Sequence, residues 1–200
     1  MPKILVVGSG GREHAPAWHL ARDDRAQLYA APGNPGIASL AQCLPIDANA
    51  ISSLAAAAEQ LHIDLTVVGP EAPLAAGLVD TFAARGLLAF GPTQRASQVE
   101  ASKVFAKNLM ARAHIPTAPF AAFDNPADGA AFVRRLKRPA VVKADGLAAG
   151  KGVVVADDAA EAIAAIDALM VRRVHGDAGA RVVIEEKLEG EEVSVLAFVH

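Results

Sequence analysis

The chain has 200 residues, of which 52% are hydrophobic and 20% charged, and its formal net charge is −3. This composition allows one ordinary domain or two small ones and excludes a disordered, collagen-like or coiled-coil protein. The slightly acidic balance argues against a nucleic-acid partner or a membrane surface. A single cysteine, Cys43, excludes an internal disulfide and a cysteine-based zinc site. No apolar run approaches the roughly 20 residues of a membrane span. We therefore expect a cytoplasmic protein.

The first hundred residues alternate short apolar runs with alanine-rich stretches. Strands are predicted at 3–7, 27–31, 65–68 and 87–90, with helices ending near residue 21 and covering 50–60 and 74–84. Such alternation predicts an α/β fold with a parallel sheet and helices on both faces. Ligands bind beyond the carboxyl ends of the strands in these sheets, so the loops after Val7, Ala31 and Val68 are the first candidates for a site.

The pattern changes in the second half. A longer helix over 97–113 is predicted to end before Pro116, and a domain boundary is expected between residues 102 and 120. Beyond it, helices are predicted at 125–137 and 158–171, and strands at 140–143, 153–156, 181–185 and 192–199. The last two strands flank a tight loop without a crossover helix, which favours antiparallel pairing.

A glycine turn, Gly8, Gly10 and Gly11, follows the first strand. It lets the backbone approach a ligand, and the positive end of the next helix favours a phosphate there. A dinucleotide site would need a glycine at position 13, where the chain has Glu13. We therefore favour a single phosphate, with Arg12 adding charge, over a nicotinamide-dependent oxidoreductase or a purely structural turn.

Two other residues of this half have open interpretations. His14 alone is more often a structural residue and gains weight only as part of Gly10–His14. Glu71 lies between Pro70 and Pro73, which fix its loop. A role at a ligand site and a role at the start of a helix both remain open for Glu71.

A second glycine loop, residues 143–152, is the most informative segment. It is not a P-loop, because Gly152 stands where serine or threonine is required and because the loop joins two strands. Its small residues let backbone N–H groups fold over phosphates. Lys151 lies at the tip and Lys143 in the preceding strand. The structural alternatives are a strand with one solvated face for Lys143 and an ordinary surface position for Lys103.

Further along the chain, the strand predicted at 181–185 ends in carboxylates, at Glu185 and Glu186. The segment after it contains Lys187, Leu188 and Glu192. One interpretation is a polar hairpin tip. The other is a hinge, at which backbone groups meet an adenine edge and an acid meets the ribose hydroxyls.

The lysine strand, the glycine loop and the strand-Glu-x-x-Leu pattern together resemble the ATP-grasp enzymes. Further motifs at 10–14, 31–34, 68–74 and 102–103 narrow this likeness. In collinear order from Lys3 to Val199, the chain resembles the N-terminal part of the phosphoribosylamine–glycine ligases, also called glycinamide ribonucleotide synthetases. Pro16 departs from the family pattern, but we expect it in the first turn of the helix, where proline is tolerated.

The resemblance implies a Rossmann-like, pre-ATP-grasp substrate domain at 1–101 and a connecting helix and linker at 102–120. It implies a small α+β ATP-grasp lid subdomain at 121–190, and the first strand of a truncated large ATP-grasp subdomain at 191–200. The implied reaction belongs to purine biosynthesis and ligates glycine to 5-phosphoribosylamine through a glycyl phosphate, with ATP as cosubstrate. It also implies Mg²⁺ or Mn²⁺ with ligands beyond residue 200, and therefore no metal ligand and no activity in residues 1–200 alone. Another ATP-grasp ligase or carboxylase, and a non-catalytic nucleotide-binding module, are the alternatives.

By resemblance, Lys143 and Lys151 are catalytic. The implied ATP-binding residues are Lys103, Lys143, Asp145, Gly146, Gly150, Lys151, Gly152, Glu185, Glu186, Lys187, Leu188 and Glu192. The implied substrate-binding residues are Gly8, Gly10, Gly11, Arg12, Glu13, His14, Gly33, Asn34, Glu71 and Pro73.

Overall fold

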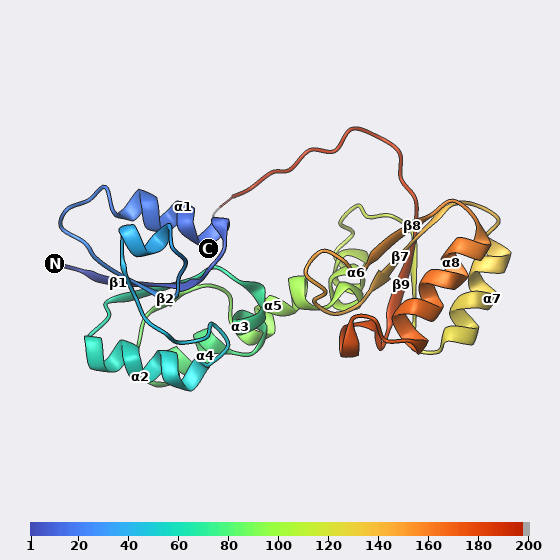
Figure 1. The fold of residues 1–200 in the computed structure, drawn as a ribbon. Coiled ribbons are helices and arrows are strands. Elements are labelled where there is room, and N and C mark those ends of the chain that lie inside the picture. Colours follow the sequence, from blue (N-terminus) through green and yellow to red (C-terminus); the bar gives the residue numbers. More distant parts are fainter. Residues whose placement is uncertain (198–200) are drawn as a thin grey trace. The chain divides into compact units, whose positions relative to one another are not determined.

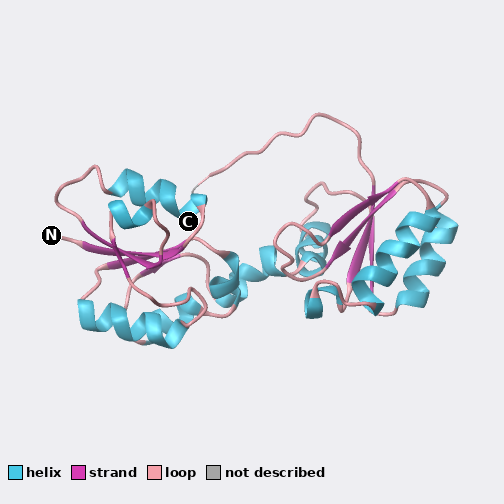
Figure 2. Ribbon diagram, in the orientation of Figure 1, coloured by secondary structure: helices cyan, strands magenta, loops and turns pink. Residues whose placement is uncertain are grey.

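A computed structural model describes residues 1–197, which divide into two units, Met1–Ala101 and a second unit that begins at Ser102. Each unit is built around one sheet with helices beside it (Figure 2). Among the described residues, every helix is too short or too polar to cross a membrane.

The first unit contains a five-stranded parallel sheet in the order β3-β2-β1-β4-β5. Its strands are β1 (Lys3–Gly8), β2 (Gln27–Pro32), β3 (Gln42–Cys43), β4 (Leu65–Val68) and β5 (Ala89–Phe90). Helix α1 (Gly11–Leu20) lies on one face, and α2 (Ile51–Leu61) and α4 (Leu78–Ala84) lie on the other (Figure 1). The predicted parallel sheet with helices on both faces is confirmed. The expected place of Pro16 in the first helical turn is wrong, because Pro16 lies inside α1.

Alternation along β1 explains this layering. Leu5 and Val7 pack into the core that holds Leu54 of α2, whereas Val6 packs with Ala17 of α1 on the opposite face. The other four strands of the sheet run parallel to β1. The carboxyl ends of all five strands therefore lie at one edge of the sheet. The candidate substrate residues follow strands at this edge.

Two predicted helices are each interrupted. The helix expected over 74–84 is divided into α3 (Glu71–Ala75) and α4 at Gly77, whose φ is +88°. The helix expected over 97–113 is divided into α5 (Gln94–Ala101) and α6 (Lys103–Arg112) at Ser102. Ser102 is extended, and its side chain caps α6 by accepting a hydrogen bond from the Phe105 amide. This break coincides with the boundary between the units.

The second unit contains a four-stranded antiparallel sheet in the order β6-β9-β7-β8. Its strands are β6 (Phe120–Phe123), β7 (Ala140–Ala144), β8 (Val153–Ala156) and β9 (Val182–Glu186). Helices α7 (Pro126–Leu136) and α8 (Ala159–Ile166) cover one face, and α6 lies on the other side of the sheet (Figure 1). A π-helical segment, Asp167–Val171, continues α8, and a 3₁₀ turn, Gly176–Gly179, precedes β9; in the first unit, a 3₁₀ turn, Ile37–Ser39, precedes β3.

The predicted strand over 192–199 is wrong for residues 192–197, which are irregular, and residues 198 and 199 lie outside the described part. The expected antiparallel hairpin with residues 181–185 is therefore not formed there. Both edges of β9 are occupied, because β6 pairs on one side and β7 on the other. A strand needs a free neighbouring edge, and β9 offers none to the residues that follow it. The assignment of 191–200 to a further subdomain stays a prediction.

Candidate functional site

A cluster of two lysines and one glutamate lies on the α6 side of the second sheet. The Lys143 ammonium nitrogen is 3.0 Å from Glu185 Oε2, and the Lys107 nitrogen is 2.9 Å from the same oxygen. On β7, Val142 is fully buried in the α7–α8 core, so the alternating Lys143 side chain points to the opposite face. Val141 lies two residues before Lys143 and points to the same face of the sheet as Lys143. Glu185 lies opposite Val141 in the β7–β9 ladder, so its side chain is on that face as well.

Glu185 has one oxygen without a partner. Its side chain is 6% exposed, and Oε1 is buried and accepts no hydrogen bond from the described residues. A buried acceptor without a donor costs free energy, so native structures usually supply one. This site therefore presents an unpaired carboxylate oxygen next to two ammonium groups, an arrangement suited to a ligand that has both a donor and an anionic group.

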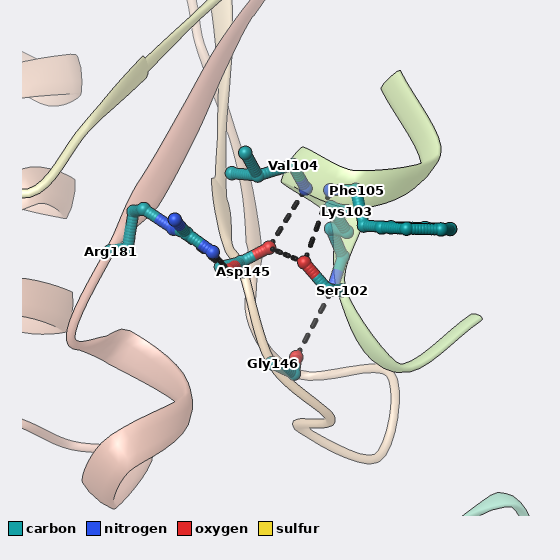
Figure 3. Close-up of polar contacts among 7 residues, drawn as sticks. All are labelled: Ser102, Lys103, Val104, Phe105, Asp145, Gly146 and Arg181. Carbon is teal, nitrogen blue, oxygen red and sulfur yellow. Dashed lines mark hydrogen bonds and ion pairs between the residues drawn. The ribbon is translucent and has the colours of Figure 1, made fainter. Parts of the chain in front are cut away.

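Asp145 connects the start of the glycine loop to α6 and β9 (Figure 3). Its Oδ1 accepts hydrogen bonds from Ser102 Oγ at 2.9 Å and from the Val104 amide at 2.8 Å. Its Oδ2 accepts from Arg181 Nε at 3.0 Å and from a terminal guanidinium nitrogen at 2.6 Å. Burial by itself raises the pKa of Asp145, but these hydrogen bonds outweigh it and hold the pKa below its usual value.

Lys103 lies directly beside this network. Its ammonium group donates to the Gly146 carbonyl at 3.2 Å, and its amide donates to the Asp145 carbonyl at 3.1 Å (Figure 3). Lys103 is thus held against the first residues of the loop, at the N-terminal end of α6.

The glycine loop is anchored at both ends and open at its tip. A Cβ on Gly146 would lie 2.8 Å from Ala178 Cα, and one on Gly152 would lie 3.0 Å from Ala144 Cβ, so both ends need glycine. Gly150 has φ +76° and nothing near it, and Lys151 is exposed. The His175 ring nitrogen Nε2 lies 3.0 Å from the Lys151 carbonyl oxygen. The tip presents small residues and one lysine to solvent.

The last residue of β9 and the residues that follow it do not gather with this cluster. Glu186 pairs with Arg138 at 2.9 Å, and Lys187 pairs with Asp157 at 2.8 Å on the surface. The hydrogen bond to Asp157 raises the pKa of Lys187. Leu188 is 68% exposed, and Glu192 is exposed in the irregular segment.

In the first unit, Glu13 fills the glycine turn at the end of β1. It is 4% exposed, and its Oε2 accepts a hydrogen bond from the Gly10 amide at 2.6 Å. A Cβ on Gly8 would lie 2.5 Å from Glu13 Cγ, and Gly69 at the end of β4 approaches the same side chain closely. Glu13 thus fills the space that the third glycine of a dinucleotide fingerprint would leave for close packing of the helix against the strand.

The remaining substrate candidates of this edge lie around the turn. Arg12 pairs with Glu71 at 2.7 Å, and this hydrogen bond lowers the pKa of Glu71 and raises that of Arg12. Asn34 donates to the Ser9 carbonyl and accepts from the Ile37 amide, both at 2.9 Å. The Gly33 amide donates to the Gly8 carbonyl at 3.1 Å.

Two more candidates differ in their surroundings. His14 lies close to Gly36, since a Cβ there would be 2.9 Å from the His14 ring, and a shallow surface cavity of about 220 Å³ adjoins His14 and Gly11. Pro73 is buried inside α3. A purely structural place for Pro73 therefore fits the observed packing.

Lys107 and Arg181 were not predicted as site residues. Lys107 follows Lys103 by four positions on α6, so both lie on one helical face. That spacing was the only signal available, and it equally suits a solvated surface. The partner of Lys107 is 78 positions away, which no local pattern reveals.

Two family models match the chain in order. The N domain of phosphoribosylglycinamide synthetase matches residues 2–100, and its ATP-grasp (A) domain matches residues 101–200. The chain belongs to the phosphoribosylglycinamide synthetase family. This membership agrees with the two units of the structure and with the resemblance seen in the motifs.

Curated relatives of this family cover nearly the whole chain. A phosphoribosylamine–glycine ligase of Ralstonia nicotianae is 55% identical over 195 residues, and one of Halalkalibacterium halodurans is 50% identical over 198 residues. They cover 97% and 98% of this chain, respectively, which spans only 46% of each relative.

Solved structures show the same fold. The phosphoribosylamine–glycine ligase of Thermotoga maritima matches with a TM-score of 0.77 and 29% identity, over 94% of this chain and 44% of that one. A biotin carboxylase domain of Hydrogenobacter thermophilus matches with a TM-score of 0.75 at 16% identity, over 94% of this chain and 44% of that one. The second likeness concerns the fold alone, so the fold does not select a reaction.

Proposed function

We propose that this chain is part of a phosphoribosylamine–glycine ligase of purine biosynthesis. The observation that carries the proposal is the identity of 55% and 50% to ligases of that name across nearly all of the chain. The reaction joins glycine to 5-phosphoribosylamine and converts ATP to ADP and phosphate. Because the chain spans about half of these relatives, the activity, substrates and partners of the whole protein are all part of the proposal.

The chemistry proposed has two steps. A carboxylate oxygen of glycine attacks the γ-phosphorus of ATP, which forms glycyl phosphate and releases ADP. The amine of phosphoribosylamine then attacks the acyl carbon, phosphate leaves with the glycine oxygen, and the amine loses a proton. Phosphoryl transfer depends mainly on positioning and on neutralising charge.

In this proposal, three lysines act on the phosphates. Lys143 and Lys151 are the catalytic pair, and Lys103 adds a third cation at the base of the loop. Three features support this: Lys143 lies in a cluster with an excess of positive charge, Lys103 is held against Gly146, and Lys151 is exposed at the tip. Gly150 and Gly152 give the loop the backbone freedom that closing over phosphates needs.

Asp145 supports ATP binding indirectly in this proposal. Both of its carboxylate oxygens already accept hydrogen bonds from protein donors. We assign Asp145 to holding the base of the loop and the N-terminus of α6, which carries Lys103.

The nucleoside is assigned to the end of β9. The unpartnered Glu185 Oε1 supports a donor there, and the amino group of adenine is such a donor. Glu186 and the backbone of Lys187 and Leu188 would complete the adenine contact, and Glu192 would face the ribose. The ribosylamine substrate is assigned to the edge of the first sheet, with Arg12 beside its phosphate.

A divalent metal, Mg²⁺ or Mn²⁺, is also part of the proposal. Within residues 1–197, no group of three or more histidine, cysteine, aspartate or glutamate side chains could hold a metal ion. The described residues therefore do not fit such a site, and no step is assigned to it here. Ligands beyond residue 200, and the cytoplasmic location, stay predictions.

The test is ADP release by the complete gene product that contains residues 1–200. We expect release that requires both glycine and phosphoribosylamine, and glycinamide ribonucleotide as the product. ADP release that depends on bicarbonate or on another amino acid, with no response to glycine, would favour a different ATP-grasp reaction and overturn the proposal.

A further inference from the structure

Lys107 shares the carboxylate of Glu185 with Lys143. The two ammonium nitrogens lie 2.9 Å and 3.0 Å from the same oxygen, Glu185 Oε2. The Lys107 side chain is 12% exposed, against 26% for Lys143. Two cations against one carboxylate leave the cluster with one net positive charge.

Lys107 is also held by two groups outside this cluster. Its ammonium group donates to Thr117 Oγ1 at 2.7 Å and lies 5.7 Å from the centroid of the Phe120 ring. A hydroxyl acceptor and a cation–π contact together fix a lysine that is largely removed from water. Lys107 therefore forms the fixed side of the cluster, and the more exposed Lys143 is the side that can reach a ligand.

The sharing has an electrostatic consequence. Without Lys107, Lys143 and Glu185 would form a neutral pair, and a neutral pair attracts a phosphate much less than a site with net positive charge. With Lys107 present, the negative charge of Glu185 is divided between two cations.

The sharing also has a geometric consequence. Both lysines bond Oε2, so the carboxylate cannot turn without breaking two short ion pairs. This orientation leaves Oε1 buried and without a donor from the described residues. The lysine pair thus determines which oxygen of Glu185 a ligand meets.

We propose that Lys107 is a positioning residue for nucleotide binding. It holds the Glu185 carboxylate with Oε1 directed to a ligand donor, and it keeps the charge of Lys143 available to phosphate. This inference rests on the proposed function for the identity of the ligand, ATP, and reaches a residue that the family resemblance did not assign.

The first test replaces Lys107 in the complete gene product by methionine, which keeps an apolar stem of similar length and removes the charge. We expect Kd for ATP, measured by calorimetry, to rise about 10-fold or more, since small misplacements of binding groups have effects of this size or larger. Lys107→Arg, which keeps the charge, should recover most of the loss. Arg112→Met removes an exposed charge from the same helix and should leave Kd unchanged.

A second variant guards against a simple folding defect. Thr117→Val removes the hydroxyl that accepts from Lys107 without changing any charge. It should also raise Kd, but by less than Lys107→Met does, and the nucleotide-free variant should keep the thermal midpoint of the wild type. A wild-type Kd for both Lys107→Met and Thr117→Val would overturn the proposal.

The decisive readout is a double-mutant cycle with Glu185→Gln. If Lys107 acts through Glu185, then Lys107→Met in the Glu185→Gln background should change Kd by no more than about twofold, which is about the error of additivity in such cycles. An equal fold-change in both backgrounds would show that Lys107 acts elsewhere and would refute the proposal. Because the readout is ATP binding, it is separate from the proposed reaction, which fails instead if the wild type binds ATP but shows no glycine-dependent ADP release.

Discussion

Asp145→Asn should destabilise the second unit more than the first. Asparagine has a single side-chain oxygen, so when that oxygen accepts from Ser102 and Val104, the amide group replaces the oxygen that accepts from Arg181. The substitution removes the charge that strengthens two hydrogen bonds from the guanidinium group.

The magnitude follows from burial. Hydrogen bonds to a charged group contribute about 1.5–3 kcal/mol each, but exposed ion pairs contribute far less. The Asp145 side chain is 12% exposed, whereas that of Arg181 is 45% exposed, so water replaces part of the lost interaction. We therefore expect a loss of about 2 kcal/mol in the free energy of unfolding of the second unit, below the roughly 3–6 kcal/mol that two fully buried bonds of this kind would contribute.

The lowered pKa of Asp145 also determines how its contribution to stability changes with pH. The pKa of Asp145 in the folded protein lies below its usual value of 3.8. The stabilisation is therefore fully present above pH 3.8 and is lost as the pH falls through the lowered pKa. The difference between wild type and Asp145→Asn should consequently shrink in that acidic window.

The assay can separate the two units in one sample. Trp18 and Tyr29, the single tryptophan and tyrosine of the chain, both lie in the first unit, so intrinsic fluorescence reports on that unit. Hydrogen exchange at the Val104 and Phe105 amides, which bond Asp145 and Ser102, reports on the network itself. Asp124→Asn, an exposed position of the second unit, serves as the matched control.

A change in opening free energy of less than about 0.5 kcal/mol, the range of ordinary surface substitutions, would refute this reasoning. So would equal destabilisation of both units, because the network is confined to the second one.

Four further outcomes are expected. Lys143→Ala should lower the ATP-dependent turnover of the complete gene product by about 100-fold or more, the scale of removing one charge-stabilising group, and a near-normal rate at saturating ATP would contradict its role. Amides of residues 148–151 should exchange rapidly without nucleotide and slowly with ATP; protection in both states would argue against a lid. Glu13→Ala should destabilise the first unit by about 1–3 kcal/mol in a fluorescence-monitored urea titration, because the Gly10 amide loses its acceptor, and an unchanged midpoint would exclude that contribution. Residues 1–200 alone should show no glycine-dependent ADP release, and turnover near that of the complete protein would show that the machinery lies within them.

Local signals in the sequence were sufficient for much of the fold. The strand predicted at 65–68 is β4, and the predicted helix starts at Asn125 and Asp158 are both capped by those side chains. Each of these features depends on a few neighbouring residues: a short β-branched run between turn signals, or a capping side chain before an alanine-rich stretch.

The errors in the predicted elements arise where residues far apart in the sequence determine the structure. The break at Ser102 was missed because helical spacing continues across it, and its geometry involves Asp145, which lies 43 positions away. β3 and β6 have few residues and gain stability from partner strands, which the sequence does not display. Gly77 is a local signal for the interruption between α3 and α4, because an isolated glycine weakens a helical pattern.

The candidate site likewise combines features that neighbouring residues predict with contacts that distant residues make. The glycine loop and its lysines were predicted from composition and spacing, whereas the Lys107–Glu185 contact and the Arg181–Asp145 contact depend on how strands pair. The expected strand is not formed at residues 192–197 for a related reason, since the apolar pattern of this segment does not reveal that β9 has no free edge.

The most direct measurement of the proposed function follows an oxygen atom. The complete gene product would be incubated with ATP, phosphoribosylamine and glycine whose carboxylate carries heavy oxygen. Formation of glycyl phosphate predicts that one heavy oxygen per turnover appears in inorganic phosphate and the other remains in the amide of the product. Phosphate without heavy oxygen, despite formation of the amide, would contradict the acyl phosphate mechanism and the proposed role of the lysine cluster in it.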